Sequence, residues 1–234
     1  MVRLGAASPS RMPAMPLSAA VRRQFRSCLE SSRFGATPYR HWLLSDTLPA
    51  EACDGIAALP YTPPVVLETY GKRETNNASR TYFNAAAQAR YPAVAAVAQA
   101  LQHPETTELI ERTCAVSLAG SSLRIEYCQD TDGFWLEPHT DIGVKRFTML
   151  VYLAREPGSE AWGTDILSDP ETFVCTVPYR YNAGLIFIPG SDTWHGFHKR
   201  PIDGVRKSII VNYVGPEWRA RHELCFPETP VGAA

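Results

Sequence analysis

The segment Glu137-Pro138-His139-Thr140-Asp141 is followed closely by the apolar run from Phe147 to Leu153. Side chains two residues apart on an extended chain point to the same side, so His139 and Asp141 are expected to share a face. An imidazole and a carboxylate held together on a stiff strand suit a divalent first-row metal ion. A second triplet of this kind, His103-Pro104-Glu105, occurs in the chain, and short motifs arise readily by chance. Other ligands must therefore decide whether His139 and Asp141 form a metal site.

Composition limits the class of protein. The chain has 234 residues, 45% of them hydrophobic, and a net charge of −1 with its lysines and arginines scattered. This is enough apolar material for one large domain or two small ones. The lack of a basic cluster argues against nucleic acid and an anionic membrane surface as partners. No apolar run of about 18 residues is present, so no membrane span is expected.

Cysteine usage indicates a reducing compartment. The six cysteines are widely spread and include no Cys-x-x-Cys pair, which argues against a zinc ribbon, a redox motif or a dense disulfide scaffold. Residues 1–29 contain arginines and no acid, as organellar presequences do, but they lack the apolar core of a secretory signal. Pro9, Pro13 and Pro16 fit a disordered tail better. We therefore expect a cytoplasmic protein.

The chain changes character near residue 120. Before it, apolar spacing predicts helices over 17–34, 48–59, 92–102 and 105–118 and a strand over 39–44, with N-cap candidates at Ser45-Asp46-Thr47. After it, short apolar segments separated by turn residues predict strands over 123–127, 146–153, 173–177, 185–188 and 208–214. Helices followed by a strand meander indicate an α+β fold with a barrel or sandwich core. We expect one domain over 1–234, with a disordered tail (1–16), mainly helical support (17–119) and a catalytic β core (120–214).

Two polar segments need interpretation. Residues 69–81 form the longest polar stretch without periodicity, and both a solvated loop and a substrate-contacting lid remain open. His103-Pro104-Glu105 falls at a helix–helix junction, where proline prevents regular strand pairing. We do not expect that triplet to bind a metal.

A catalytic metal site needs a third protein ligand. His195 follows the apolar strand Leu185 to Ile188 and a Pro-Gly turn. Two histidines and one carboxylate make the facial triad associated with non-haem Fe(II). His198 is the competitor, but on an extended chain positions 195 and 198 face opposite sides. We favour His195, because His198 lies beside Lys199 and Arg200 and is expected to be solvated.

The last long strand begins with Arg206-Lys207-Ser208, and Arg206 and Ser208 share a face. A guanidinium and a hydroxyl can together hold a terminal carboxylate of a dicarboxylic acid. The residues that follow, Ile209 to Tyr213, predict a buried strand. Arg206 would then be buried as well, and a buried arginine needs an anionic partner.

The order His139-x-Asp141, His195, Arg206-x-Ser208 resembles the pattern of the Fe(II)/2-oxoglutarate-dependent oxygenases, over roughly residues 120–214. The chain is most similar to compact bacterial members related to prolyl-hydroxylase-like domains. The resemblance implies a double-stranded β-helix (jelly-roll, cupin-like) core with flanking N-terminal helices.

The resemblance also implies roles for single residues. His139, Asp141 and His195 would ligate Fe(II), and Arg206 and Ser208 would bind the distal carboxylate of 2-oxoglutarate. A tyrosine on the preceding strand often contacts the cosubstrate in this family, and Tyr127 is the expected counterpart. Arg124 is its rival, since the two face opposite ways on a regular strand.

The implied reaction couples O2 and 2-oxoglutarate to oxidation of an unactivated C–H bond, with release of succinate and CO2. Hydroxylation is the expected outcome, while desaturation and ring formation remain open. Related halogenases lack the carboxylate ligand, so Asp141 argues against halogenation. The prolyl-hydroxylase branch often has lysine where this chain has Arg206. This difference weakens the resemblance to that branch.

Other functions remain open. A small-molecule substrate is expected, with Arg80, Asn76, Asn77, Trp135 and Trp162 as candidate contacts, and a peptide or protein hydroxylase is the alternative. A cupin-like metal protein independent of 2-oxoglutarate would not need Arg206-x-Ser208. In a jelly-roll ligand-binding module, the histidines and aspartate would only line a polar pocket. The sequence does not indicate an oligomeric state.

Overall fold

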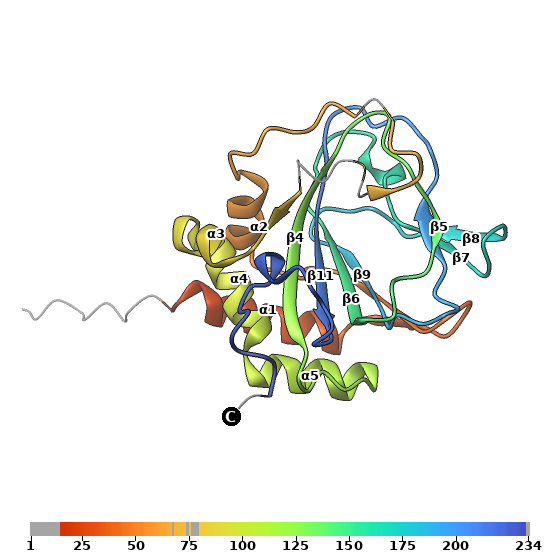
Figure 1. Ribbon diagram of the computed structural model, residues 1–234. Coiled ribbons are helices and arrows are strands. Elements are labelled where there is room, and N and C mark those ends of the chain that lie inside the picture. The colour runs from red at the N-terminus through yellow and green to blue at the C-terminus, as the bar shows by residue number, and fades with distance from the viewer. Residues whose placement is uncertain (1–14, 67, 74, 76–79, 233–234) are drawn as a thin grey trace, which may run out of the picture.

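The computed structural model describes residues 15–66, 68–73, 75 and 80–232 (Figure 1). Its helices pack together on one side of a large β-sheet. They are α1 (Leu17–Glu30), α2 (Ala50–Ala57), α3 (Ala85–Arg90), α4 (Pro92–Gln102) and α5 (Pro104–Cys114). Short 3-10 turns follow at Ser159–Ala161 and Arg221–Glu223.

Helix ends reflect local residue chemistry. Proline occupies the first turn of α4 and of α5, where its missing N–H costs nothing. His103 caps α5 by accepting a hydrogen bond at Nδ1 from the Glu105 amide, so the second His-x-acid triplet is a helix start. Contrary to the cap expected at residues 45–47, Pro49 precedes α2 without a side-chain cap. Helix α5 ends four residues earlier than expected, because Ala115 adopts a left-handed conformation.

The strands form two antiparallel sheets. The seven-stranded sheet has the order β1-β2-β9-β6-β11-β4-β3, and the four-stranded sheet has the order β5-β10-β7-β8. The bounds in the large sheet are β1 (Arg33–Gly35), β2 (His41–Leu44), β9 (Gly184–Phe187), β6 (Lys145–Tyr152), β11 (Arg206–Val214), β4 (Ser122–Asp130) and β3 (Thr81–Tyr82). Those in the small sheet are β5 (Leu136–His139), β10 (His195–Phe197), β7 (Asp165–Leu167) and β8 (Phe173–Thr176).

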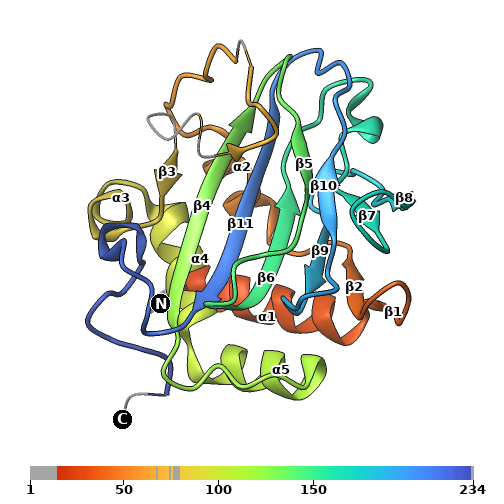
Figure 2. The ribbon, with the colours of Figure 1, turned by 45° about the vertical axis from the view of Figure 1, so that its right-hand side comes forward.

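Each face of the large sheet has its own core. One face packs on the helices through residues such as Ile125, Val151 and Val211. The opposite face, including Tyr152 and Phe187, packs on the small sheet. Figure 2 shows β5 and β10 in front of β6 and β11, with α1 and α2 behind them. The expected α+β class is confirmed: helices, large sheet and small sheet form three layers.

The long strands agree with the sequence expectation, and the shortest elements were missed. Strands β1, β3, β5, β7 and β10 have two to four residues, which is too short to show a period of two. Three of these form most of the small sheet. No helix in the described part of the chain is long and apolar enough to cross a lipid bilayer.

Candidate metal centre

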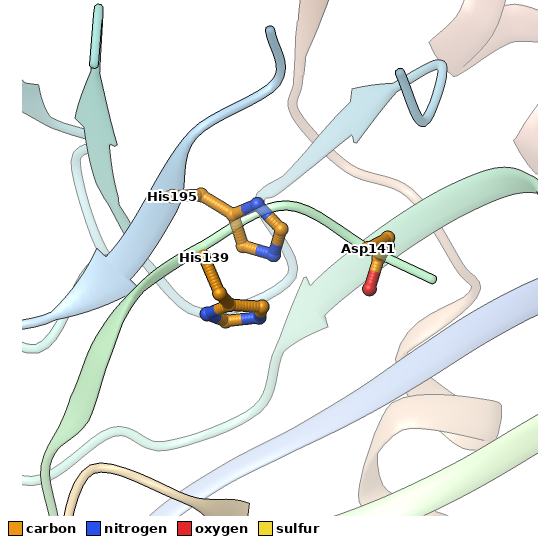
Figure 3. Close-up of side chains that lie close together, drawn as sticks. All are labelled: His139, Asp141 and His195. Carbon is orange, nitrogen blue, oxygen red and sulfur yellow. The ribbon is translucent and has the colours of Figure 1, made fainter. Parts of the chain in front are cut away.

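Three side chains from two segments of the chain meet between the sheets (Figure 3). His139 ends β5, Asp141 lies in the turn that follows, and His195 begins β10. Strands β5 and β10 pair so that His139 and His195 are direct cross-strand partners, with ring centroids 4.3 Å apart. One candidate ligand atom from each of the three residues lies within 4.8 Å of the other two. Asp141 reaches the site from the turn, so strand alternation is not what brings it beside His139.

Backbone carbonyls orient both imidazoles. Nδ1 of His139 lies 2.8 Å from the Glu137 carbonyl oxygen, and Nδ1 of His195 lies 2.9 Å from that of Thr193. A carbonyl can only accept, so each Nδ1 is the donor, and in the neutral imidazole the free lone pair lies on Nε2. Burial lowers the pKa of His195 to about 4, which keeps this imidazole neutral near neutral pH. Both histidines therefore present Nε2 as a ligand.

The carboxylate of Asp141 is held at both oxygens. Oδ1 lies 2.5 Å from Nζ of Lys145, and Oδ2 accepts a 2.6 Å hydrogen bond from the Thr148 hydroxyl. Burial alone would raise the pKa of Asp141, but the Lys145 charge and these hydrogen bonds lower it to about 2. Asn212 donates to the Thr148 hydroxyl at 2.9 Å, which fixes the direction in which Thr148 donates. Asp141 is therefore ionised and oriented.

His198, the competing ligand, lies outside this cluster. Its side chain is 55% exposed, and Nδ1 lies 2.8 Å from the buried carboxylate of Asp165. Arg200 and Thr176 also donate to Asp165. His198 thus belongs to a separate polar group that joins β10 to β7 and β8.

The three clustered residues line a cavity of about 350 Å³ between the sheets. Its other charged lining residues include Arg73, Arg80, Arg124, Glu126, Arg206 and Glu223. Phe134, Leu136 and Phe197 supply apolar wall. A cavity with apolar walls and a few charged side chains is typical of a binding site for a small polar molecule.

Arg206 and Ser208 lie on the inner face of β11, as expected. Arg206 lines the cavity, and its Nη1 lies 2.5 Å from Asp130 while its Nε donates to the Trp162 carbonyl. Ser208 is fully buried, and its hydroxyl has no hydrogen-bond partner among the described residues. The required anionic partner of Arg206 is thus present in the chain as Asp130, which the sequence reasoning did not identify.

The structure corrects the placement expected for Tyr127. Its ring belongs to the helix-side core, with its centroid 6.4 Å from that of Tyr61, and it does not line the metal-centre cavity. Its rival Arg124 lines that cavity. The strand β4 is regular, so alternation places Arg124 inward and Tyr127 outward.

Sequence reasoning also missed a buried charge network beside the metal centre. Glu126 accepts hydrogen bonds from Arg80 and Arg124, and Arg124 also pairs with Glu223 at 2.6 Å. Burial would raise the pKa of Glu126, but these arginines lower it to about 2. A usable signal was present, because the charged residues Arg124 and Glu126 alternate with Leu123, Ile125 and Tyr127 along one strand.

Of the other candidate substrate contacts, some line the cavity and some do not. Arg80 lines the cavity, whereas Trp162 is buried in the inter-sheet core and the Trp135 indole donates to Glu68 away from it. Asn76 and Asn77 lie outside the described residues, as do positions 74, 78 and 79 of the 69–81 segment. The described part of that segment is not simply solvated, since Arg73 lines the cavity.

Comparisons with known proteins find similarity in structure. No family model matches the sequence, and no curated protein matches it. A prolyl 4-hydroxylase structure from Phytophthora capsici superposes with a TM-score of 0.57 at 10% identity, covering 88% of this chain and 70% of the other. A prolyl hydroxylase from Trichoplax adhaerens, in complex with a peptide fragment of hypoxia inducible factor, gives 0.54 at 12% identity, covering 88% and 94%.

HygX from Streptomyces hygroscopicus, with nickel and 2-oxoglutarate bound, gives a TM-score of 0.50 at 13% identity, covering 76% of this chain and 84% of HygX. At these identities the likeness concerns the fold. The chain therefore has the fold of these prolyl hydroxylases and of HygX.

Proposed function

We propose that the protein is an Fe(II)- and 2-oxoglutarate-dependent dioxygenase, with His139, Asp141 and His195 as the iron ligands. The observation that carries the proposal is the convergence of two imidazoles and one ionised carboxylate in a cavity that also contains a buried arginine. This donor set suits non-haem Fe(II), because three protein ligands leave positions for a cosubstrate and dioxygen.

Arg206 lines the cavity and fits the distal carboxylate of 2-oxoglutarate, and Ser208 lies two residues further along the same face of β11 without itself lining the cavity. The Nη2 group of Arg206 has no acceptor within the described part of the chain, and the buried Ser208 hydroxyl also lacks a partner there. A buried hydroxyl without a hydrogen bond is costly, and a bound carboxylate would satisfy it. HygX, which shares the fold, binds 2-oxoglutarate together with a metal.

We infer that β4 to β11 form the double-stranded β-helix of such oxygenases. Two four-stranded antiparallel arrays support this, β9-β6-β11-β4 and β5-β10-β7-β8, because they face each other and enclose the cavity. Residues 120–214 would then be the catalytic core and residues 17–119 its mainly helical support, within a single domain.

When bound, the iron and its cosubstrate supply the oxidising chemistry, and the chain contributes orientation and exclusion of water. Lys145 and Thr148 hold Asp141 from both oxygens, so its position does not depend on the metal. Phe134 and Phe197 line the cavity and make that part of its wall apolar. The oriented carboxylate and the apolar wall would position the reactants and limit the access of water to them.

A small charged metabolite is the substrate that the cavity supports best, and hydroxylation is its proposed fate. The arginines and glutamates beside the metal centre can pair with a polar substrate that enters a cavity of about 350 Å³. A peptide is the second candidate, because the fold is shared with a prolyl hydroxylase that binds a peptide fragment.

Anaerobic titration tests the proposal. Addition of Fe(II) and then 2-oxoglutarate is expected to produce the weak visible charge-transfer absorption of a chelated complex. Protein that binds Fe(II) yet shows no such absorption would overturn the cosubstrate assignment. Succinate release across a panel of charged metabolites and proline-containing peptides then separates the two substrate classes.

A further inference from the structure

The cavity beside the metal centre has an excess of buried positive charge. Its cationic lining consists of Arg73, Arg80, Arg124, Lys145 and Arg206, whereas four carboxylates pair with them, namely Asp130, Glu126, Asp141 and Glu223. The pairing is uneven at one place only among the described residues: Arg73 and Arg206 share the single carboxylate of Asp130. Burying two cations with one anion is unfavourable unless another negative charge is supplied.

The two guanidinium groups are placed alike. Arg73 pairs with both oxygens of Asp130, at 2.8 and 3.3 Å, and Arg206 pairs with Oδ2 at 2.5 Å. The Cζ atom of Arg73 lies 4.6 Å from the ring centroid of Phe134, and that of Arg206 lies 4.7 Å from the ring centroid of Phe197. The two phenyl rings contact each other, with centroids 5.7 Å apart. All four side chains line the cavity.

Both guanidinium groups also keep donors free. Neither Nε of Arg73 nor Nη2 of Arg206 has a hydrogen-bond acceptor in the part of the chain that the structure describes. A carboxylate that entered here would accept from one free donor group of each guanidinium and would balance the local charge. A neutral acceptor would leave the local charge unbalanced.

We propose that Arg73 is a second cosubstrate-binding residue, which acts with Arg206 on the distal carboxylate and so selects a dicarboxylic 2-oxo acid over a monocarboxylic one. This inference rests on the proposed function. It assigns a role to residues 69–73, which lie more than 100 residues before Arg206 in the chain.

The segment that carries Arg73 is docked on the strand that ends at His139. The Thr69 hydroxyl donates to the Trp135 carbonyl at 2.6 Å, and the Glu137 amide donates to the Gly71 carbonyl at 3.0 Å. Gly71 has φ of +70°, and an added Cβ would lie 2.8 Å from Glu137, so only glycine allows this approach. These contacts fix the backbone that precedes Arg73, and they do not require a bound ligand.

The test compares two cosubstrates of equal chain length, 2-oxoglutarate and 2-oxopentanoate, which ends in a methyl group. Dissociation constants are measured anaerobically with Fe(II)-loaded protein, by the charge-transfer absorption. Arg73→Gln is expected to weaken 2-oxoglutarate about tenfold to a hundredfold, since it removes a charge-assisted contact. It should leave 2-oxopentanoate within about twofold, because no distal carboxylate is present to lose that contact. Lys72→Ala, an exposed cation on the same segment, is the matched control and should change neither constant.

Equal weakening of both 2-oxo acids, or of neither, would overturn the role of Arg73. If Arg73→Gln fails to fold, Arg73→Lys replaces it, because lysine keeps a positive charge beside Asp130. The proposal then requires a smaller loss that is again confined to 2-oxoglutarate. Absence of the absorption in the unaltered, iron-loaded protein would instead contradict the proposed function itself, so the two failures are distinguishable.

Discussion

Arg206 and Asp130 are direct cross-strand partners at the end of the β4–β11 pair, and their side chains form a buried ion pair at 2.5 Å. The pair holds Arg206 in place together with the Trp162 carbonyl, which accepts from Nε. A guanidinium fixed in this way needs little reorganisation when a ligand binds. Asp130 therefore orients Arg206, and the remaining Nη2 group is available to an incoming carboxylate.

Replacing Arg206 tests the cosubstrate site separately from the metal site. Arg206→Gln is expected to weaken 2-oxoglutarate binding by roughly tenfold to a hundredfold, because a charge-assisted contact is lost. Fe(II) binding should persist, since Arg206 is not part of the His139–Asp141–His195 cluster. Anaerobic titration of each ligand measures both effects. If the affinity for 2-oxoglutarate were unchanged, the assignment of Arg206 to the cosubstrate site would be wrong.

The two nearby histidines form a matched pair for metal binding. His195→Ala should abolish the rise in melting temperature that a divalent metal produces, because a ligand is lost. His198→Ala should retain that rise, since His198 is half-exposed and pairs with Asp165 instead. Thermal unfolding with and without Fe(II) or Ni(II) measures both. A metal response that depended on His198 would reverse the ligand assignment.

Thr148 is not one of the three clustered residues, but its hydroxyl orients the carboxylate of Asp141, and this role can be tested. Thr148→Val removes the hydroxyl that donates to Asp141 at 2.6 Å, with little change in shape. Metal affinity should fall by about tenfold, as is typical when a hydrogen bond to a metal ligand is lost. Thr176→Val removes an equally short bond to Asp165, away from the cluster, and should leave metal affinity unchanged. Calorimetric titration with Ni(II) compares the two, and equal losses would contradict the role of Thr148.

The buried carboxylate of Glu126 should contribute a pH-dependent part of the stability. Its pKa in the folded protein is lowered from 4.5 to about 2, so folding is favoured by on the order of 3 kcal/mol once the carboxylate is ionised in both states. The contribution is present above the ordinary pKa and is lost as the pH falls toward the folded value.

Glu126→Gln should therefore be clearly less stable than the unaltered protein at pH 7, and the gap should narrow as the pH falls from about 5 to about 3. Denaturant unfolding at a series of pH values measures this gap. Glu105→Gln, which loses only an exposed pair with Arg26, should show no comparable gap. A gap that stayed constant with pH would show that the ionisation of Glu126 is not the cause.

Sequence patterns anticipated the long elements and the main candidate site residues. The helices α1 and α4 and the strands β4, β6 and β11 are long enough to show their hydrophobic period. His195 was favoured over His198 because His198 lies beside Lys199 and Arg200 and was expected to be solvated, and the structure places His195 in the cluster. On β4, strand alternation placed Arg124 and Tyr127 on opposite faces, but only the pairing of β4 with β11 showed which of them faces the cavity.

By itself the sequence determined which residue types could bind a metal, in what order they occur, and that helices precede a β core. Only the tertiary structure decided which charges meet. Arg73, Asp130 and Arg206 come from three distant segments, and their association depends on the strand register and on the docking of residues 69–71 against residues 135–137. The physical reason is that local periodicity reports which face of an element is buried, whereas the partner across the cavity is set by long-range packing.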